Sequence, residues 1–311
     1  MNKLIFCVGI PGGGKSHWAE THKDELNAVI HSSDAIREEL GDVNDQSQNN
    51  LVFETLHKRV KDDLCNGKNV IYDATNLSRK RRISFLHELE KIPCEKICVL
   101  FATPWEIALA NNFARDRQVP EDVMVRMIKS FEVPSKYEGW DDIQIVWYDY
   151  KNISGFEYDF HDDIEKWRSV SHSNPHHSLS IGDHMIVTYN NALAKTDDFL
   201  LSLAAYMHDC GKIDVKSFVD SKGNTSEIAH FYSHENVSAY KSLFYLKDLF
   251  TSEYMKLSDY EIIYVSLLIN LHMRPFVWEQ SEKAKEKDRR LFGDDIIHQL
   301  EVLHECDVAA K

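Results

Sequence analysis

The sequence has no long apolar run, few cysteines and too little positive charge to offset its acidic residues. No apolar stretch approaches the roughly 20 residues that span a bilayer, so no membrane partner is expected. The first residues, MNKLIFCVGI, run into a glycine-rich motif without a cleavage site, which favours a strand over a signal peptide. The six cysteines form no CxxC pair, which argues against a zinc ribbon or disulfide framework and favours a reducing cytoplasm.

The deficit of positive charge limits the partners that the chain can attract. It has 36 Lys and Arg against 50 Asp and Glu, a net charge of -14. A polyanion is repelled at long range by such a protein unless local basic patches dominate, which argues against broad, sequence-blind nucleic-acid binding, so any contact must be local. The run SRKRR at 78–82 is one local candidate, although runs of this kind are more often a solvated helix face.

The pattern of apolar residues divides the chain into two parts. Its 311 residues are about two average domains, and its 43% hydrophobic composition is ordinary for a globular protein. In the first part, five apolar runs alternate with helical stretches, which predicts an α/β domain with a parallel sheet and flanking helices. The predicted strands are 4–10, 27–33, 69–75, 95–103 and 143–149.

Beyond about residue 170 strand signals disappear and long helix-period stretches take over, which predicts an all-α second domain. The stretch 150–178 between the two parts lacks a clean period, and its later portion is rich in Ser, Asn, Pro and His, as a connector would be. We therefore predict domains at 1–160 and 161–311, with the boundary near residue 160.

The strongest motif is GIPGGGKS, which matches the phosphate-loop pattern GxxxxGK[ST] between a predicted strand and a predicted helix. Its backbone N–H groups would surround the phosphates of ATP, Lys15 would reach the β and γ oxygens, and Ser16 would hold magnesium. The alternative is a chance glycine turn. The residues predicted to bind the nucleotide and its metal are Gly9, Pro11, Gly12, Gly13, Gly14, Lys15, Ser16 and Arg117.

Polar residues at the ends of the next two strands predict an acceptor site. Asp34 and Arg37 follow the second strand, and Asp73 and Asn76 follow the third, at the sheet edge where α/β proteins bind ligands. Asp34 is predicted to take the proton from an attacking hydroxyl, and Arg37 to hold a phosphate on the acceptor. Asp34 could instead cap a helix, with Arg37 as a surface charge.

A polar helix end, a Val-Pro break and a second amphipathic helix follow in NNFARDRQVPEDVMVRMIKSFEVP. Arg115 and Arg117 stand just before the break, where cations can offset the charge of a transferring phosphoryl group. Either arginine could instead serve the negative end of a helix dipole.

The first domain resembles the phage-type polynucleotide kinases and their close P-loop relatives through GIPGGGKS, SSDAIREEL, YDATN and RDRQVPEDV…FEVP. The resemblance implies a P-loop kinase fold with a lid. It also implies that Asp34 is the general base, that Arg37 and Asp73 lie near the acceptor, and that Arg115 is the lid arginine. Family members often show an Arg-Asn pair where this chain has Asn111 and Asn112.

The second domain contains AYMHDCGKID, with His208 and Asp209 adjacent, after His184 and far before Asp307. This order and the HDxGK wording resemble the HD phosphohydrolase superfamily, which implies a helical bundle that holds metal between its helices. His234 and His272 fall where members with two metals carry extra ligands, and Asp209 would bridge the two ions.

Imidazole and carboxylate ligands suit manganese or another divalent transition metal, or magnesium, better than they suit structural zinc. Two such ions would support phosphoester hydrolysis, with Lys212 on the substrate phosphate. For any one of these histidines the alternative is a hydrogen-bonded core residue.

Together the two halves predict an RNA end-healing enzyme, a 5′-OH polynucleotide kinase joined to a 3′-phosphatase or 2′,3′-cyclic phosphate hydrolase. Its partners would be single-stranded or nicked nucleic-acid ends, RNA before DNA, and a downstream RNA ligase. One alternative is a metabolite or nucleotide kinase fused to an HD nucleotidase, which suits the acidic charge better. Another is a regulatory protein with a degenerate HD module. The sequence does not determine the oligomeric state.

Overall fold

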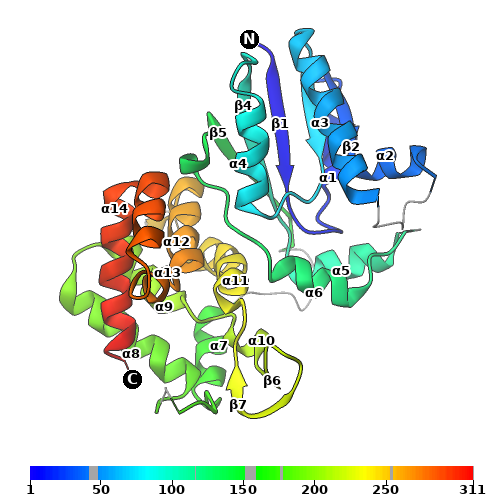
Figure 1. Ribbon diagram of the computed structural model, residues 1–311. Coiled ribbons are helices and arrows are strands. Elements are labelled where there is room, and N and C mark those ends of the chain that lie inside the picture. The colour runs from blue at the N-terminus through cyan, green and yellow to red at the C-terminus, as the bar shows by residue number, and fades with distance from the viewer. Residues whose placement is uncertain (42–47, 116, 151–158, 176–177, 253–254, 311) are drawn as a thin grey trace. The chain divides into compact units, whose positions relative to one another are not determined.

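The computed structural model describes residues 1–41, 48–115, 117–150, 159–175, 178–252 and 255–310 (Figure 1). The chain forms two compact units. The first consists of Met1–Met127 and Pro134–Asp149, and the second of Ile128–Val133 and Tyr150–Lys311. The domain boundary near residue 160 stays a prediction, and it falls ten residues inside the second unit.

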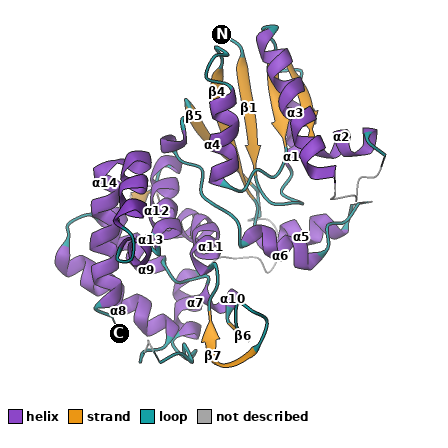
Figure 2. Cartoon of the chain, in the orientation of Figure 1, coloured by secondary structure: helices purple, strands orange, loops and turns teal. Residues whose placement is uncertain are grey.

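The first unit is built on a parallel five-stranded sheet with the order β2-β3-β1-β4-β5, which confirms the predicted parallel α/β architecture (Figure 2). Its apolar interior includes Ile5, Ile71, Val99 and Phe101. The strands are β1 (Lys3–Val8), β2 (Ala28–Ser32), β3 (Asn69–Asp73), β4 (Glu95–Ala102) and β5 (Asp142–Trp147). All five predicted strands are present, because buried parallel strands read as continuous apolar runs.

The connections between these strands are mostly helical, as the crossover of parallel strands requires. They bring the segments that follow β1, β2 and β3 to the same edge of the sheet. The helices are α1 (Lys15–His22), α2 (Ser33–Glu39), α3 (Asn49–Cys65), α4 (Arg79–Glu88), α5 (Trp105–Phe113), α6 (Glu121–Ile128) and the 3₁₀ helix η2 (Lys136–Glu138).

The second unit is mainly helical, with α9 packed against both α8 and α12, and α11 packed against α12. The long α14 is kinked at Gly293, whose φ of 80° lies in the left-handed region that glycine tolerates. The helices are α7 (Phe160–Trp167), α8 (Ile181–Lys195), α9 (Phe199–Met207), α10 (Lys212–Val215), α11 (His234–Leu249), α12 (Asp259–Leu271), α13 (Arg274–Trp278) and α14 (Glu282–Val308).

Two features of the second unit correct the sequence-based expectation. It is not all-helical, because β6 (Ser217–Val219) pairs with β7 (Thr225–His230), and β8 (Thr251–Ser252) pairs with β9 (Met255–Lys256). The β6-β7 strands are largely exposed, so they lack the apolar pattern that marks a buried strand.

The expected connector also contains a helix, α7. Asp159 caps it by accepting hydrogen bonds from the backbone N–H groups of His161 and Asp162. Its buried residues Phe160, Ile164 and Trp167 are spaced four and three residues apart, and this helical spacing was present in the sequence.

The segment Ile128–Val133 belongs to the second unit although it comes between parts of the first. Phe131 is fully buried and packs edge-on against Tyr240, with ring centres 5.0 Å apart. The Asn270 side chain accepts from the Val133 N–H at 3.2 Å and donates to the Phe131 carbonyl at 3.3 Å. The side chain of Asn236 donates in the same way to the Lys129 carbonyl.

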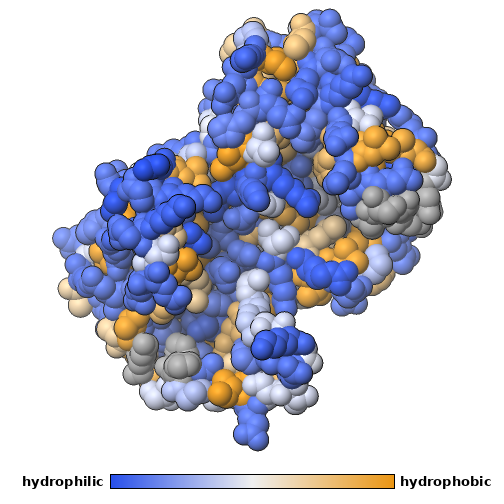
Figure 3. All heavy atoms as spheres, in the orientation of Figure 1, coloured by the Kyte–Doolittle hydropathy of each residue, from blue (hydrophilic) through white to orange (hydrophobic). Residues whose placement is uncertain are grey.

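No helix in the described part of the chain is long and apolar enough to cross a membrane. The face of the molecule seen in Figure 3 is mostly hydrophilic, in keeping with the high content of charged residues.

Candidate active sites

The phosphate loop of the first unit has the backbone that close contact with phosphates requires. Gly12 and Gly14 have φ values of 75° and 84°, and a Cβ on Gly12 would lie 2.0 Å from the Ala108 carbonyl oxygen. Only glycine fits at position 12. Asn111 donates to the Gly12 carbonyl at 3.0 Å and Thr103 donates to the Gly13 carbonyl at 3.1 Å, so α5 and the residue that follows β4 fix the loop from outside.

Lys15 and Ser16 lie where the motif predicts, on the first turn of α1. Lys15 is buried and its Nζ donates to the Ile10 carbonyl at 2.8 Å. Burial lowers the pKa of Lys15, and the carboxylate of Asp73 opposes that shift. The Ser16 hydroxyl donates to Asp73 Oδ2 at 2.7 Å, which pairs the predicted magnesium ligand with a carboxylate suited to the same ion.

Asp34, Arg115 and Arg117 come together in the structure. Arg117 Nη1 lies 2.7 Å from Asp34 Oδ1, and Arg115 Nη2 lies 3.9 Å from Asp34 Oδ2. Ser32, not Asp34, caps α2 by accepting from the Asp34 N–H at 3.2 Å. The helix-cap alternative for Asp34 is therefore wrong, and its carboxylate faces two guanidinium groups instead.

Arg37 is buried on α2, and burial lowers its pKa. One terminal nitrogen donates to the Asn49 side chain, while Nε has no hydrogen-bond partner among the described residues. A buried guanidinium with an unused N–H can donate a hydrogen bond to an anionic oxygen, as the predicted substrate role requires.

The Asn76 amide is already used inside the protein. It donates to the Cys7 carbonyl at 2.8 Å, and Asn76 has a φ of 50° in the left-handed region. This contact ties the loop after β3 to the end of β1. The substrate role of Asn76 stays a prediction.

The basic run is not a free phosphate-binding surface, which corrects one argument for a long nucleic-acid substrate. Arg82 is fully buried, with Nε and Nη2 each 2.7 Å from Glu138, and Arg79 Nε lies 3.7 Å from the same carboxylate. Only Lys80 and Arg81 of the run are exposed. This pairing could not be predicted from the sequence, because Glu138 lies 56 residues from Arg82.

The six predicted metal ligands of the second unit lie in two adjoining groups. His184, His208 and Asp307 form one group, and the ligand atoms of Asp209, His234 and His272 form the other, each within 4.8 Å of one another. They come from α8, the turn after α9, the start of α11, the end of α12 and the end of α14. Residues spread over the second half of the sequence thus converge.

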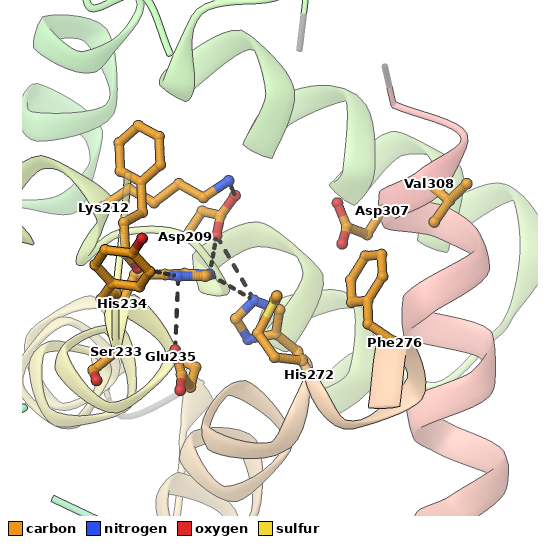
Figure 4. A pocket seen from close by; sticks show the side chains of 12 residues that line it. Asp209, Lys212, Ser233, His234, Glu235, His272, Phe276, Asp307 and Val308 are labelled. Atoms are coloured by element: carbon orange, nitrogen blue, oxygen red, sulfur yellow. Dashed lines mark hydrogen bonds and ion pairs between the residues drawn. The ribbon is translucent and has the colours of Figure 1, made fainter. Parts of the chain in front are cut away.

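Asp209 lies between the two groups. Its Oδ2 is 3.4 Å from His184 Nε2 and 3.2 Å from His208 Nε2, while its Oδ1 is 3.2 Å from His234 Nε2 and 3.8 Å from His272 Nε2. Figure 4 shows this carboxylate facing His234 and His272. One oxygen toward each group is the arrangement that a bridging carboxylate needs.

Hydrogen bonds to backbone carbonyls fix the state of the four imidazoles. Each Nδ1 lies 2.7 to 3.1 Å from a carbonyl oxygen, which can only accept, so Nδ1 carries the proton and a neutral ring has its lone pair on Nε2. For His184, His208, His234 and His272 the accepting carbonyls belong to Ala310, Ala205, Phe231 and Ile269.

These lone pairs face one another. The Nε2 atoms of His184 and His208 are 3.3 Å apart, and those of His234 and His272 are 3.1 Å apart. Two lone pairs at this distance beside a carboxylate repel unless a cation lies between them. The donor set therefore fits divalent metal ions, and backbone bonds to the opposite ring nitrogen are the usual support of histidine ligands.

In the metal-free protein, protons can supply that positive charge. Burial alone would lower the pKa of His208, but the carboxylates of Asp209 and Asp307 outweigh it and raise the pKa to about 10. His272 is different, because burial and the neighbouring imidazoles lower its pKa to about 3. For Asp209 and Asp307 burial opposes ionisation, yet the surrounding cations hold the pKa of each well below its usual range.

A pocket of about 500 Å³ opens beside this cluster (Figure 4). Polar residues of the cluster form one part of its wall and apolar side chains form the rest. Lys212 lines it and also pairs with Asp209, with Nζ 2.6 Å from Oδ2. The complete lining is Asp209, Lys212, Phe231, Tyr232, Ser233, His234, Glu235, His272, Met273, Phe276, Asp307 and Val308.

Comparison with known proteins gives a family match in the first half of the chain. The family model for the AAA domain matches residues 4–134. L-seryl-tRNA(Sec) kinase of Methanococcus maripaludis is 24% identical over 143 residues, which are 44% of this chain and 56% of that protein. The chain thus spans about half the length of this relative. With the parallel sheet and the phosphate loop, the family match shows a P-loop domain.

Two solved structures show partial likeness. A chain of the Pnkp1/Rnl/Hen1 RNA repair complex is 23% identical, with a TM-score of 0.38 over 42% of this chain and 43% of that one. A candidate kinase from Chloroflexus aurantiacus is 16% identical, with a TM-score of 0.40 over 47% and 85%. Both likenesses are too limited to specify an activity or a substrate.

Two structurally important side chains had no distinct signal in the sequence. Asn112 is fully buried, and its amide exchanges two hydrogen bonds with the backbone of Val119, which holds the ends of the loop that carries Arg115 and Arg117. His172 is fully buried beside Lys212, although it lies in a stretch that reads as a connector.

Proposed function

We propose that the protein is a bifunctional nucleic-acid end-healing enzyme with two phosphate-processing sites. The first unit would act as an ATP- and magnesium-dependent kinase of 5′-hydroxyl ends, and the second as a metal-dependent hydrolase of 3′-phosphate or 2′,3′-cyclic phosphate ends. The observation that supports this proposal most strongly is that one chain contains both sites. The first has a phosphate loop and the cluster of Asp34 with two arginines, and the second has Asp209 between two pairs of imidazoles.

For phosphate transfer, Asp34 would accept the proton of the attacking hydroxyl. Arg117 and Arg115 already contact its carboxylate and are placed to move onto the transferring phosphoryl group when ATP binds. Lys15 would move from the Ile10 carbonyl to the β and γ oxygens. The buried N–H of Arg37 would hold a phosphate already present on the acceptor.

For hydrolysis, His184, His208 and Asp307 would hold one ion, His234 and His272 the other, and Asp209 would contact both. Bound divalent ions supply an activated water and offset the negative charge of the phosphate. The protein's own contribution is to hold all four Nε2 atoms toward the site and to place the Lys212 ammonium in the pocket wall. The HD-type classification belongs to this proposal.

RNA ends, single-stranded or nicked, are the favoured substrate, and a downstream RNA ligase is the expected partner. The relative that acts on seryl-tRNA supports a kinase whose acceptor hydroxyl is attached to RNA.

A specific observation favours a second candidate, a small-metabolite or nucleotide kinase fused to a nucleotidase. Arg82 and Arg79 are buried against Glu138, so the basic run offers a longer strand less charge than its sequence suggests. The net charge of -14 also suits a small substrate better than a polyanion.

One experiment separates the two candidates. The protein would be incubated with ATP, magnesium, manganese and an oligoribonucleotide that carries a 5′-OH and a 2′,3′-cyclic phosphate, and the product would be weighed by mass spectrometry. A 5′-phosphate gained together with hydrolysis of the terminal phosphate supports end healing. An untouched oligonucleotide, from protein that hydrolyses ATP or binds metal, supports the small-molecule candidate.

A further inference from the structure

Lys212 is buried beside the metal-ligand cluster, and its ammonium group has neighbours on three sides. Nζ lies 2.6 Å from Asp209 Oδ2, 3.4 Å from His172 Nε2 and 5.5 Å from the centre of the Phe231 ring. A lysine ammonium has three N–H donors. Two of them meet Asp209 and His172, and because Lys212 also lines the pocket, the third can reach a ligand there (Figure 4).

His172 is set up to accept a hydrogen bond from Lys212. It is fully buried, and its Nδ1 donates to the Leu179 carbonyl at 2.9 Å, which leaves the Nε2 lone pair toward the ammonium. Its ring packs edge-on against His184 and Phe231, with centres 5.5 and 5.9 Å apart.

His172 belongs to neither group of metal ligands among the described residues. Its Nε2 lies 3.4 Å from the Lys212 ammonium. The four proposed ligand histidines share their Nε2 face with one another or with a carboxylate, and His172 differs from them in this respect.

We propose that His172 is a positioning residue for the hydrolytic site, which holds Lys212 so that its ammonium binds a non-bridging oxygen of the substrate phosphate. The inference rests on the proposed function of the second unit. Lysine is a flexible side chain. If His172 already holds the Lys212 ammonium in place, less conformational entropy is lost when the phosphate binds. Without His172, the ion pair with Asp209 at 2.6 Å would be the main contact that orients the ammonium, which could then rotate about it.

The charge of Lys212 also implies a preference among phosphate ligands. An ammonium attracts a doubly charged phosphate more strongly than a singly charged phosphodiester. Lys212, held by His172, therefore favours a terminal phosphomonoester or inorganic phosphate over a cyclic phosphate.

The test measures binding of inorganic phosphate to the full-length, manganese-loaded protein by calorimetry, which requires no turnover. His172→Phe keeps a ring in the site but removes the acceptor, whereas His172→Gln keeps an acceptor. We expect His172→Phe to weaken phosphate binding about tenfold, the effect of losing one well-placed charged contact. His172→Gln should stay within about threefold of the wild type, because its amide oxygen can still accept from Lys212.

A double-mutant cycle distinguishes positioning from general support of the fold. If His172 acts through Lys212, His172→Phe has no further effect on phosphate binding in a Lys212→Ala background. An equal loss in both backgrounds overturns the proposal, and so does a loss of manganese from His172→Phe in elemental analysis. If His172→Phe does not fold, His172→Asn, which is too short to reach Lys212, takes its place.

Failure of this inference can be told apart from failure of the proposed function. If the wild type binds phosphate but hydrolyses no phosphoester, the hydrolase proposal fails while the cycle still reports on His172. If the manganese-loaded wild type does not bind phosphate, the role given to Lys212 is wrong and the inference falls with it.

Discussion

Arg117 and Asp34 form a close ion pair, with Arg117 Nη1 2.7 Å from Asp34 Oδ1, at a position where the Asp34 side chain is 49% exposed. An exposed pair of this kind contributes little to folding stability, about 0 to 1 kcal/mol. Its significance is therefore local. A carboxylate that can take a proton and a cation that can stabilise a moving phosphoryl group are already next to each other.

Asp34→Asn is expected to abolish phosphate transfer, because the amide cannot accept the proton of the attacking hydroxyl. Nucleotide binding should persist, since Lys15 and the loop glycines are untouched. Transfer would be measured with labelled ATP and a 5′-OH oligonucleotide, and ATP binding by calorimetry. Lys15→Ala is the matched control, which should lose transfer through weaker phosphate binding. Hydrolysis of phosphate ends should survive both changes, and its loss would contradict the assignment of one activity to each unit.

Arg37→Ala should impair acceptors that bear a 3′-phosphate more than those that lack one. The buried guanidinium has an N–H without a partner in the described structure, which an acceptor phosphate would engage. Steady-state kinetics with the two acceptors would measure the difference. Equal losses for both would remove the role given to Arg37.

Substitution of the proposed metal ligands should follow the two groups seen in the structure. Asp209→Ala removes the carboxylate that faces both groups, so we expect it to lose all bound metal. His272→Ala removes a ligand from one group only and should lose about half of the metal, because the group of His184 stays complete. Elemental analysis of protein dialysed against manganese would test this order, and His304→Ala, outside both groups, is the control.

Metal binding should release protons and strengthen as the pH rises. The raised pKa of His208, about 10, means that its Nε2 side is protonated at neutral pH in the metal-free protein. A metal ion needs that lone pair, so binding displaces the proton and the apparent affinity rises about tenfold per pH unit for each proton released, up to the pKa. Calorimetry in buffers of different ionisation enthalpy counts the protons. An affinity that does not change between pH 6.5 and 8.5 would contradict this reasoning.

The sequence predicted the parallel sheet well because its strands depend on local patterns, and the metal-ligand set stays a prediction. Buried strands are continuous apolar runs, and the phosphate loop has a fixed spacing of glycine, lysine and serine. The pair His208-Asp209 is likewise adjacent in the chain. These residues can be named from the sequence alone, and the structure adds their positions and distances.

The parts that the sequence did not predict depend on distant or weak contacts. Glu138 neutralises Arg82 across 56 positions, so a residue of the basic run forms a buried ion pair. The β6-β7 strands are largely exposed, so no apolar alternation marked them. The position of His172 beside Lys212 follows from packing between segments 40 residues apart.

Asn270→Ala is expected to destabilise the second unit. The change leaves the buried N–H of Val133 and the carbonyl of Phe131 without the partners that Asn270 provides, at a cost of about 1 to 3 kcal/mol. Chemical denaturation followed by fluorescence would measure the loss. Asn66→Ala, at an exposed position, is the control and should have a small effect. An unchanged unfolding midpoint for Asn270→Ala would mean that the segment 128–133 contributes little to the unit.

Arg82→Met should destabilise the first unit strongly because it leaves Glu138 buried without its main cation. Arg82 and Glu138 are joined by two contacts of 2.7 Å in a site closed to solvent, and removal of one partner from such a pair costs about 3 to 5 kcal/mol. The exposed neighbour provides the comparison, since Arg81→Ala should change the free energy of unfolding by less than about 0.5 kcal/mol. If α4 contacts a nucleic-acid strand, oligonucleotide binding should respond in the opposite way to stability. Arg81→Ala should weaken the salt-dependent affinity for an oligonucleotide. The double variant Arg82→Met with Glu138→Leu should keep that affinity unchanged. A weaker oligonucleotide affinity in the folded double variant would mean that Arg82 contributes to nucleic-acid binding, and would contradict its purely structural role.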